Sequence, residues 1–183
     1  MLPKFFKYIF SVLAMAFILN ACTEDVNFSQ ADDLEVEPTL ASSIFYFEST
    51  EEVINLAGSG AFYTEDFTFE AFSEAFVADR ILDGVITYQL ENSTSKQIDL
   101  EIEFLDANGN TIDSEFFSIQ PEPAPITEIQ VAYGDGGKSL DILRNTRTIR
   151  VNGSNLGDDT SISSQPEPKI ILRSSAAFTV KLQ

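Results

Sequence analysis

The sequence predicts an all-β domain, folded as a β-sandwich with one short helix. Residues 98–104 alternate strictly between apolar and acidic side chains, which is the pattern of a strand with one buried face. Further runs of β-branched and aromatic residues are separated by short segments rich in Gly, Pro, Asn and Asp. Many short strands joined by such turns are typical of two packed sheets.

Two strands are expected before residue 98, and a third segment is ambiguous. Ser42–Phe47 is a short run of aromatic and β-branched residues, and Gly84–Asn92 alternates with apolar side chains on one side. Phe67–Phe76 is rich in phenylalanine. Its first two phenylalanines have the spacing of a strand and its last two the spacing of a helix, so the pattern does not decide between them.

A hairpin is expected directly after the alternating segment. Asp106–Asn110 has the composition of a tight turn, and Gly109 suits the left-handed position that follows a type I turn. The loop is then three residues long and the returning strand is Thr111–Ile119.

This loop length fixes an expected register for the hairpin. It places Phe104 opposite Ile112 and Leu100 opposite Phe116, so that apolar residues pair on the face toward the core. A slip by one residue would move every side chain of one strand to the other face. We therefore expect the apolar pairing to specify the register.

The other face of this hairpin then carries an acidic patch. Glu103 is expected opposite Asp113, and Glu101 opposite Glu115. Like charges in directly opposite positions destabilise a strand pair. The patch has three interpretations: a solvated outer face, a Ca²⁺ site built from carboxylate oxygens, or the paired carboxylates of an inverting glycosidase. A solvated face is the simplest of the three.

The remaining chain continues the β pattern. Three prolines between residues 121 and 125 interrupt strand pairing, and residues 134–137 form a glycine-rich turn. Residues 139–145 have two leucines at helical spacing and predict the short helix. The other expected strands are Ile126–Tyr133, Thr146–Val151, Lys169–Ser174 and Ala177–Leu182.

The first 21 residues have the features of an export signal. Lys4 and Lys7 precede an apolar run from Tyr8 to Leu19. As a helix this run would extend about 18 Å, which is too short for a hydrocarbon core of about 30 Å. We therefore predict a removable signal peptide at residues 1–21 rather than a transmembrane anchor.

The residues around Cys22 resemble the lipobox of bacterial lipoproteins. Leu19-Asn20-Ala21-Cys22 places a small residue before a cysteine at the end of the apolar run. The resemblance implies cleavage after Ala21, lipid on the Cys22 thiol and attachment to a membrane. The alternative is a buried or free cysteine. Cys22 is the only cysteine, so no intrachain disulfide forms.

The mature chain would contain a tether and one domain. Removing 21 residues from 183 leaves 162, enough for a single hydrophobic core. Residues 22–40 are acidic and poor in large apolar side chains, which predicts a disordered tether with a reach of about 23 Å. Residues 41–183 are then the β-sandwich domain.

The charge of the chain excludes some partners. Without the signal segment, 9 Lys and Arg residues stand against 29 Asp and Glu residues, a formal net charge of −20. Such a surface disfavours nucleic acid and anionic lipid and favours solubility or a cationic partner. The last 46 residues are the exception, with seven basic residues and four acidic ones.

Several catalytic chemistries lack their residues. The chain has no histidine, which removes Ser–His–Asp triads and histidine-ligated zinc. The Gly134–Ser139 segment has glycines and a lysine but not the spacing of a phosphate-binding loop. No tryptophan is present to form a sugar-stacking platform.

The lipobox and the acidic segment after it together resemble lipoproteins of the Bacteroidota. In that group an acidic stretch after the lipidated cysteine can direct export to the cell surface, and Thr23-Glu24-Asp25 is similar to one form of that signal. An ordinary acidic tether is the alternative. The β domain also resembles the small Ig-like domains of such proteins, a resemblance of pattern that transfers no functional residues.

These observations favour a lipid-anchored outer-membrane lipoprotein without enzymatic activity or cofactor. Its expected role is that of a binding or accessory module, attached to the membrane through Cys22 and in contact with outer-membrane proteins. The domain faces either the cell surface or the periplasm. A surface adhesin that binds Ca²⁺ or a glycan is the alternative, with Glu101, Glu103, Asp113 and Glu115 as the metal ligands. A hydrolase that uses carboxylates has the least support.

Overall fold

The structure is a computed structural model that describes residues 36–69, 78–122 and 124–182. The chain separates into two units, Met1–Leu34 and Glu35–Gln183, and every described residue belongs to the second. The predicted signal peptide, Cys22 and most of the predicted tether therefore lie outside the described residues. So does most of the ambiguous phenylalanine-rich segment. Within the described part of the chain, no helix is long and apolar enough to cross a membrane.

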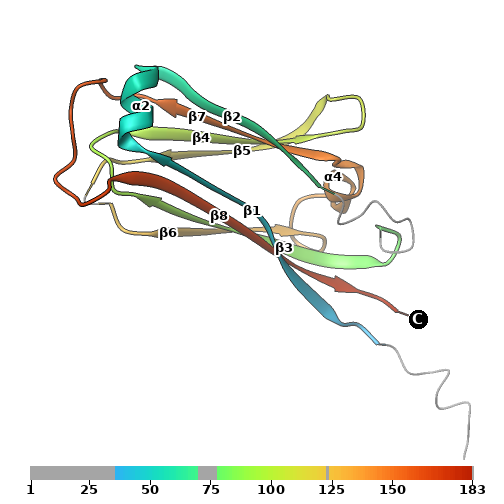
Figure 1. Cartoon of the computed structure of the whole chain (residues 1–183). Coiled ribbons are helices and arrows are strands. Elements are labelled where there is room, and N and C mark those ends of the chain that lie inside the picture. The colour runs from blue at the N-terminus through green and yellow to red at the C-terminus, as the bar shows by residue number, and fades with distance from the viewer. Residues whose placement is uncertain (1–35, 70–77, 123, 183) are drawn as a thin grey trace, which may run out of the picture. The chain divides into compact units, whose positions relative to one another are not determined.

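Eight strands and two short helices, α2 and α4, are defined within the described ranges of the folded unit (Figure 1). One sheet has the strand order β1-β8-β3-β6 and the other β2-β7-β4-β5. All paired strands are antiparallel. The elements are β1 (Thr39–Thr50), α2 (Glu51–Ala57), β2 (Gly60–Thr68), β3 (Ile81–Asn92), β4 (Ile98–Leu105), β5 (Thr111–Ile119), β6 (Thr127–Tyr133), α4 (Leu140–Asn145), β7 (Thr148–Asn155) and β8 (Lys169–Val180).

The predicted β-sandwich is thus confirmed, and its connectivity is that of a jelly roll. The chain crosses from one sheet to the other at every connection between consecutive strands except β4 to β5. Two four-stranded sheets joined in this way form the eight-stranded jelly roll, whereas an Ig-like sandwich of the constant type has seven strands, split four and three.

The core lies between the sheets and follows the alternation of the sequence. In β4 the side chains of Ile98, Leu100, Ile102 and Phe104 are fully buried, while the acidic residues between them point outward. β3 and β8 contribute their own alternating apolar residues from the other sheet. Gly84 in β3 leaves space for an aromatic ring, because a Cβ there would lie 2.2 Å from the Phe178 side chain.

The predicted register of the β4–β5 hairpin is wrong by one residue. Gly109 has the expected left-handed conformation, with φ at 80°, and Leu105 pairs with Thr111. A β-bulge follows, and Phe104 pairs with Asp113. The additional residue in the bulge is Ile112, which makes two residues of one strand oppose one of the other.

The bulge changes which residues of β5 face the core. Leu100 pairs with Phe117 rather than with Phe116, and Phe116 is 63% exposed. Asp113 and Glu115 share the inward face of β5 with Phe117. The apolar pairing that we expected to fix the register is therefore satisfied by a different phenylalanine.

The other elements agree with the sequence in part. The short helix at 139–145 is confirmed, with the Ser139 side chain accepting a hydrogen bond from the Asp141 N–H at its N-terminus. The two expected closing strands are one continuous strand, β8. β1 begins at Thr39, so the last residues assigned to the tether pair with β8. The sequence interpretation contained neither α2 nor most of β2.

Candidate functional site

The four carboxylates predicted as one patch lie on two faces of the sandwich. Glu101 and Glu103 point outward from β4, whereas Asp113 and Glu115 lie on the inward face of β5. The one-residue bulge separates them. Across the described residues, no cluster of three or more His, Cys, Asp or Glu side chains is arranged to hold a metal ion.

Asp113 and Glu115 form an ion-pair cluster with Lys138. The Lys138 ammonium donates hydrogen bonds to Asp113 at 2.7 Å and to Glu115 at 2.6 Å. Lys138 follows β6, the edge strand of the opposite sheet, so it closes the side of the sandwich between β5 and β6. Burial alone would lower the pKa of Lys138, but the hydrogen bonds to Asp113 and Glu115 and the negative charges of these carboxylates together outweigh burial and raise that pKa.

The outward carboxylates are used within the sheet or are solvated. Glu103 accepts hydrogen bonds from the Thr111 hydroxyl at 2.8 Å and from the Asn152 amide at 3.0 Å. Glu101 is exposed. Glu101 and Glu103 therefore do not share a face of the sandwich with Asp113 and Glu115.

A large hollow in the described part of the domain lies beside α2. We call it the α2 groove; its volume is about 740 Å³. This volume falls in the usual range for ligand pockets, about 300–1,000 Å³. The residues that line it are Glu48, Thr50, Glu51, Glu52, Asn55, Leu56, Asp159, Ile162, Glu167, Pro168 and Lys169.

Two apolar side chains in the groove are unusually exposed. Leu56 in α2 is 82% exposed, and Ile162 in the connection from β7 to β8 is 78% exposed. No other large apolar residue in the described ranges is more than 63% exposed. Exposed apolar side chains that gather within a polar rim are characteristic of interaction sites.

The buried carboxylate of Glu51 connects the segments beneath the groove through hydrogen bonds. This side chain is 2% exposed and accepts hydrogen bonds from the Ser95 N–H and hydroxyl, each at 2.6 Å. It also accepts one from the Ser163 N–H at 2.8 Å. A single residue of α2 therefore joins the β3–β4 loop and the β7–β8 connection, two segments that are distant in sequence.

A buried lysine fixes the same connection from the other side. The side chain of Lys96 is 1% exposed, and its ammonium donates to Asp158 at 2.9 Å and to the Ser161 carbonyl at 2.8 Å. The pKa of Asp158 lies well below its usual value because of hydrogen bonds from Ser161, Lys96 and Thr160. The segment that carries Ile162 is thus positioned by charge-assisted hydrogen bonds.

Polar groups along the groove are mostly acceptors. Five carboxylates line it, together with one lysine, Lys169, which pairs with Glu48 at 3.2 Å. The Asn55 amide donates to the Ser161 carbonyl at 3.2 Å, while its buried Oδ1 accepts no hydrogen bond from the described residues. The exposed carboxylates of Glu52 and Asp159 pair with no described residue, so the groove offers unused acceptors next to apolar walls.

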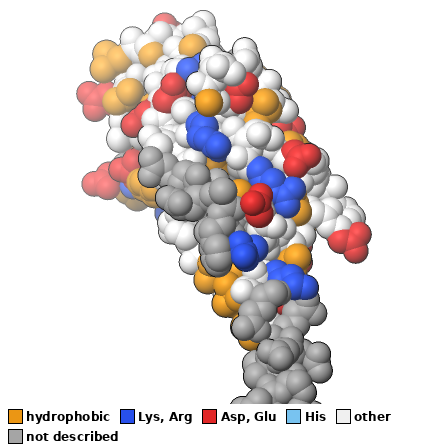
Figure 2. All heavy atoms as spheres, turned by 90° about the vertical axis from the view of Figure 1, so that its right-hand side faces the viewer, with side chains coloured by type: hydrophobic (Ala, Val, Ile, Leu, Met, Phe, Trp, Pro, Cys, Tyr) orange, Lys and Arg blue, Asp and Glu red, His pale blue; other side chains and the backbone are white. Residues whose placement is uncertain are grey.

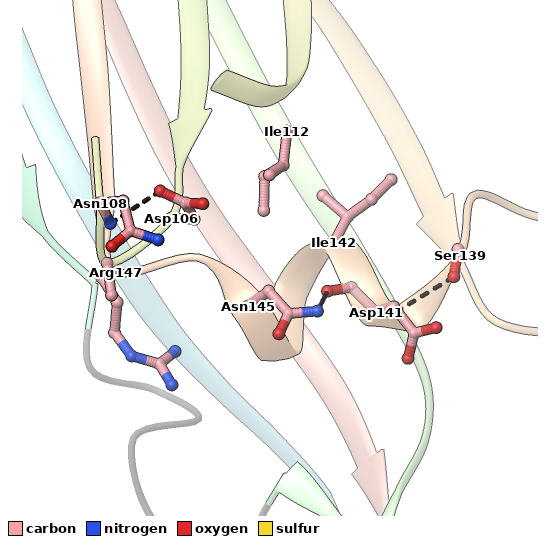
Figure 3. A pocket seen from close by; sticks show the side chains of 9 residues that line it. Asp106, Asn108, Ile112, Ser139, Asp141, Ile142, Asn145 and Arg147 are labelled. Atoms are coloured by element: carbon pink, nitrogen blue, oxygen red, sulfur yellow. Dashed lines mark hydrogen bonds between the residues drawn. The ribbon is translucent and has the colours of Figure 1, made fainter. Parts of the chain in front are cut away.

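A second hollow lies at α4, with a volume of about 480 Å³ (Figure 3). Its polar residues bond to one another: the Asn108 N–H donates to Asp106 at 2.8 Å, and the Asn145 amide donates to the Asp141 carbonyl at 2.7 Å. The Arg147 guanidinium donates to two backbone carbonyls. Because its donors and acceptors are satisfied locally, this hollow is the weaker candidate.

The end of the domain that carries α4 has mixed charge (Figure 2). Lys and Arg side chains lie there between Asp and Glu side chains. Arg144 illustrates their use: it pairs with Asp141 at 3.1 Å and donates to the Ala78 carbonyl at 2.9 Å. The basic residues near α4 thus take part in internal contacts.

The sequence contained a signal for α2 that our interpretation did not use. Thr50 caps the helix, two glutamates occupy its first turn, and Gly58 follows its end with φ at 83°. A cap, acidic residues in the first turn and a terminal glycine are the usual marks of a helix. Seven residues were too few to stand out between two strands.

No protein-family model matches the chain, and no curated protein matches its sequence. Solved structures with some similarity include VP2 of infectious bursal disease virus, which is 9% identical with a TM-score of 0.40. That match covers 79% of this chain and 32% of the VP2 chain, so this chain spans about a third of its length.

Two smaller proteins match over most of their own length. A Bacillus endospore appendage pilus protein is 9% identical, with 80% of this chain and 91% of that chain covered and a TM-score of 0.35. A protein of Desmodium yellow mottle tymovirus is 10% identical, with 81% of this chain and 84% of that chain covered and a TM-score of 0.36. Similarities at this level carry no statement about function.

Proposed function

We propose that the chain is an outer-membrane lipoprotein, anchored by lipid on Cys22, whose sandwich acts as a non-catalytic binding or accessory module of an outer-membrane assembly. The observation that carries the binding role is the α2 groove, where the two most exposed large apolar side chains of the described residues lie together. The signal-like first 21 residues and the lipobox resemblance support the anchoring.

The position of the groove supports this role. β1 runs from Thr39 to Thr50 and leads directly into α2, so the groove lies at the opposite end of β1 from the point where the chain enters the domain. Eleven residue steps at about 3.3 Å separate those two ends by about 36 Å. Figure 1 shows α2 and the first residues of β1 at opposite ends of the strand. A domain attached by its N-terminal side would keep this end free for a partner.

The anchoring is tested by metabolic labelling with a palmitate analogue. We expect the native chain to incorporate the label and to fractionate with the outer membrane. The Cys22→Ser variant should do neither. Label that persists in Cys22→Ser, or a native chain without label, would contradict the anchor.

The accessory role is tested by recovery of the protein through a C-terminal tag from membranes solubilised in mild detergent. A stoichiometric outer-membrane partner is the expected result. Recovery of the lipoprotein alone would argue against an accessory subunit. A turnover that is lost on substitution of Glu101 or Glu103 would refute the non-catalytic role.

A further inference from the structure

We propose that the α2 groove binds a cationic, aliphatic segment of a partner protein, in which Lys or Arg side chains lie next to leucine-like ones. This inference rests on the proposed binding role and adds to it the place of binding and the chemistry of the partner. It follows from the apolar walls of the groove, its charge and its unused acceptors.

The apolar walls require an occupant with apolar groups. Leu56 and Ile162 come from segments more than a hundred residues apart in sequence, yet both line the same hollow. They are 82% and 78% exposed, and no described residue covers them. Contact with an aliphatic side chain would remove this surface from water, which is the main favourable contribution in most protein associations.

The charge of the groove selects a cationic occupant. Among the lining carboxylates, Glu51 is used by backbone donors and Glu48 by Tyr46 and Lys169. Glu52 and Asp159 make no hydrogen bond or ion pair with any described residue. An anionic partner would meet these carboxylates and be repelled, whereas a cationic one would be attracted.

The exposed carboxylates of Glu52 and Asp159 are hydrogen-bond acceptors that no described residue uses, which gives a second reason for an occupant with N–H donors. Lys and Arg supply N–H donors and carry an apolar stem, and therefore match both the acceptors and the apolar walls.

A protein segment fits the groove better than an anionic lipid surface. The groove lies at the end of β1 farthest from the entry of the chain, and its free charges are negative. Anionic headgroups would be repelled by Glu52 and Asp159. Binding to vesicles of anionic lipid is measured as well, because it would identify a membrane contact instead of a protein partner.

The test uses the chain from residue 22 to residue 183 with Cys22→Ser, and three fluorescent pentapeptides. One peptide alternates leucine with lysine, one alternates leucine with glutamate, and one alternates glycine with lysine. Binding is measured by fluorescence anisotropy at about 0.15 M salt, where distant charges are largely screened. We expect the leucine–lysine peptide to bind most tightly and the leucine–glutamate peptide not to bind.

Matched variants separate the groove from the net charge of the protein. The double variant Glu52→Gln/Asp159→Asn should weaken binding roughly three- to tenfold, as expected for two exposed ion pairs. Leu56→Ser should weaken it by a similar factor. The controls Glu101→Gln/Asp135→Asn and Ile126→Ser change exposed residues elsewhere and should leave the affinity unchanged.

Three results would overturn the inference. Equal weakening by the two double variants would mean that only net charge matters. Equal affinity for the glycine–lysine peptide, or no effect of Leu56→Ser, would exclude the apolar contact. Binding to vesicles of anionic lipid that depends on Glu52 or Leu56 would identify a membrane contact instead. If the peptide test fails while palmitate labelling and partner recovery succeed, the site is wrong and the proposed function stands.

Discussion

Replacing Phe117 by alanine tests the register of the β4–β5 hairpin, on which the placement of four carboxylates depends. Phe117 is 7% exposed, pairs with Leu100, and its ring lies 5.2 Å from that of Tyr88. The neighbouring Phe116 is 63% exposed and pairs with Glu101. The two variants remove the same side chain from adjacent positions, so each is the control of the other.

The expected magnitudes follow from burial. Truncating a buried phenylalanine to alanine costs about 3–5 kcal/mol, because a cavity remains in the core. Full burial of a large apolar side chain is worth about 1.5–3 kcal/mol, and Phe116 buries 37% of its surface, which gives about 0.6–1.1 kcal/mol. Phe117→Ala should therefore lower the free energy of unfolding by at least about 2 kcal/mol more than Phe116→Ala.

Equilibrium unfolding in urea measures both values. The midpoint should fall strongly for Phe117→Ala and slightly for Phe116→Ala, with the dependence on urea unchanged. In the register expected from the loop length alone, Phe116 faces Leu100 and the order reverses. Equal costs, or the larger cost at Phe116, would refute the bulge at Ile112.

Three other substitutions test the contacts that hold the fold. Glu51→Ala removes the acceptor of two backbone N–H groups and should lower the unfolding free energy by about 1–3 kcal/mol in urea, while Glu52→Ala, which is exposed, should not. The pKa of Asp158 is lowered in the folded chain, so its contribution to the free energy of unfolding is present above about pH 4 and is lost as the pH falls. The difference in melting temperature between the native and Asp158→Asn proteins should therefore shrink from pH 7 to pH 3. The pKa of Lys138 is raised in the folded chain, so its contribution to the free energy of unfolding is present below about pH 10.4 and is lost as the pH rises. The melting temperatures of the native and Lys138→Met proteins should therefore converge above that pH. A constant difference across pH in either case would contradict the assigned pairing.

The fold class was predictable because alternation and turns are local properties. β4 shows strict alternation in its sequence, and the structure buries each of its apolar residues. The break that we expected near residue 175 was wrong, because Ser174–Ala177 lies in the middle of β8, between β1 and β3. Small residues with weak strand preference are held there by hydrogen bonds from both neighbours.

The bulge was not predictable from the hairpin sequence. Either register places a phenylalanine of β5 opposite Leu100, so the local apolar pattern does not distinguish them. The inward carboxylates of Asp113 and Glu115 pair with Lys138, which follows β6 of the other sheet. A contact between sheets is a tertiary property that the periodicity of one strand does not contain.

The α2 groove depends on the same kind of long-range contact. Its two walls carry Leu56 and Ile162, whose segments meet through Glu51 and Ser163. The sequence marks the helix through its cap and its terminal glycine, but it does not indicate which segment packs beside it. The acidic composition of the chain agrees with the five carboxylates that line the groove, but it does not indicate where they gather.

The most direct test of the central claim is site-specific photo-cross-linking in native cells. A photo-reactive amino acid replaces Leu56 in the groove in one strain and Ile126, exposed elsewhere on the domain, in a second. A binding module that uses the α2 groove should give one discrete protein adduct from position 56 and none from position 126. That adduct should disappear with Glu52→Gln/Asp159→Asn. No adduct at position 56, or the same adducts from both positions, would contradict the account.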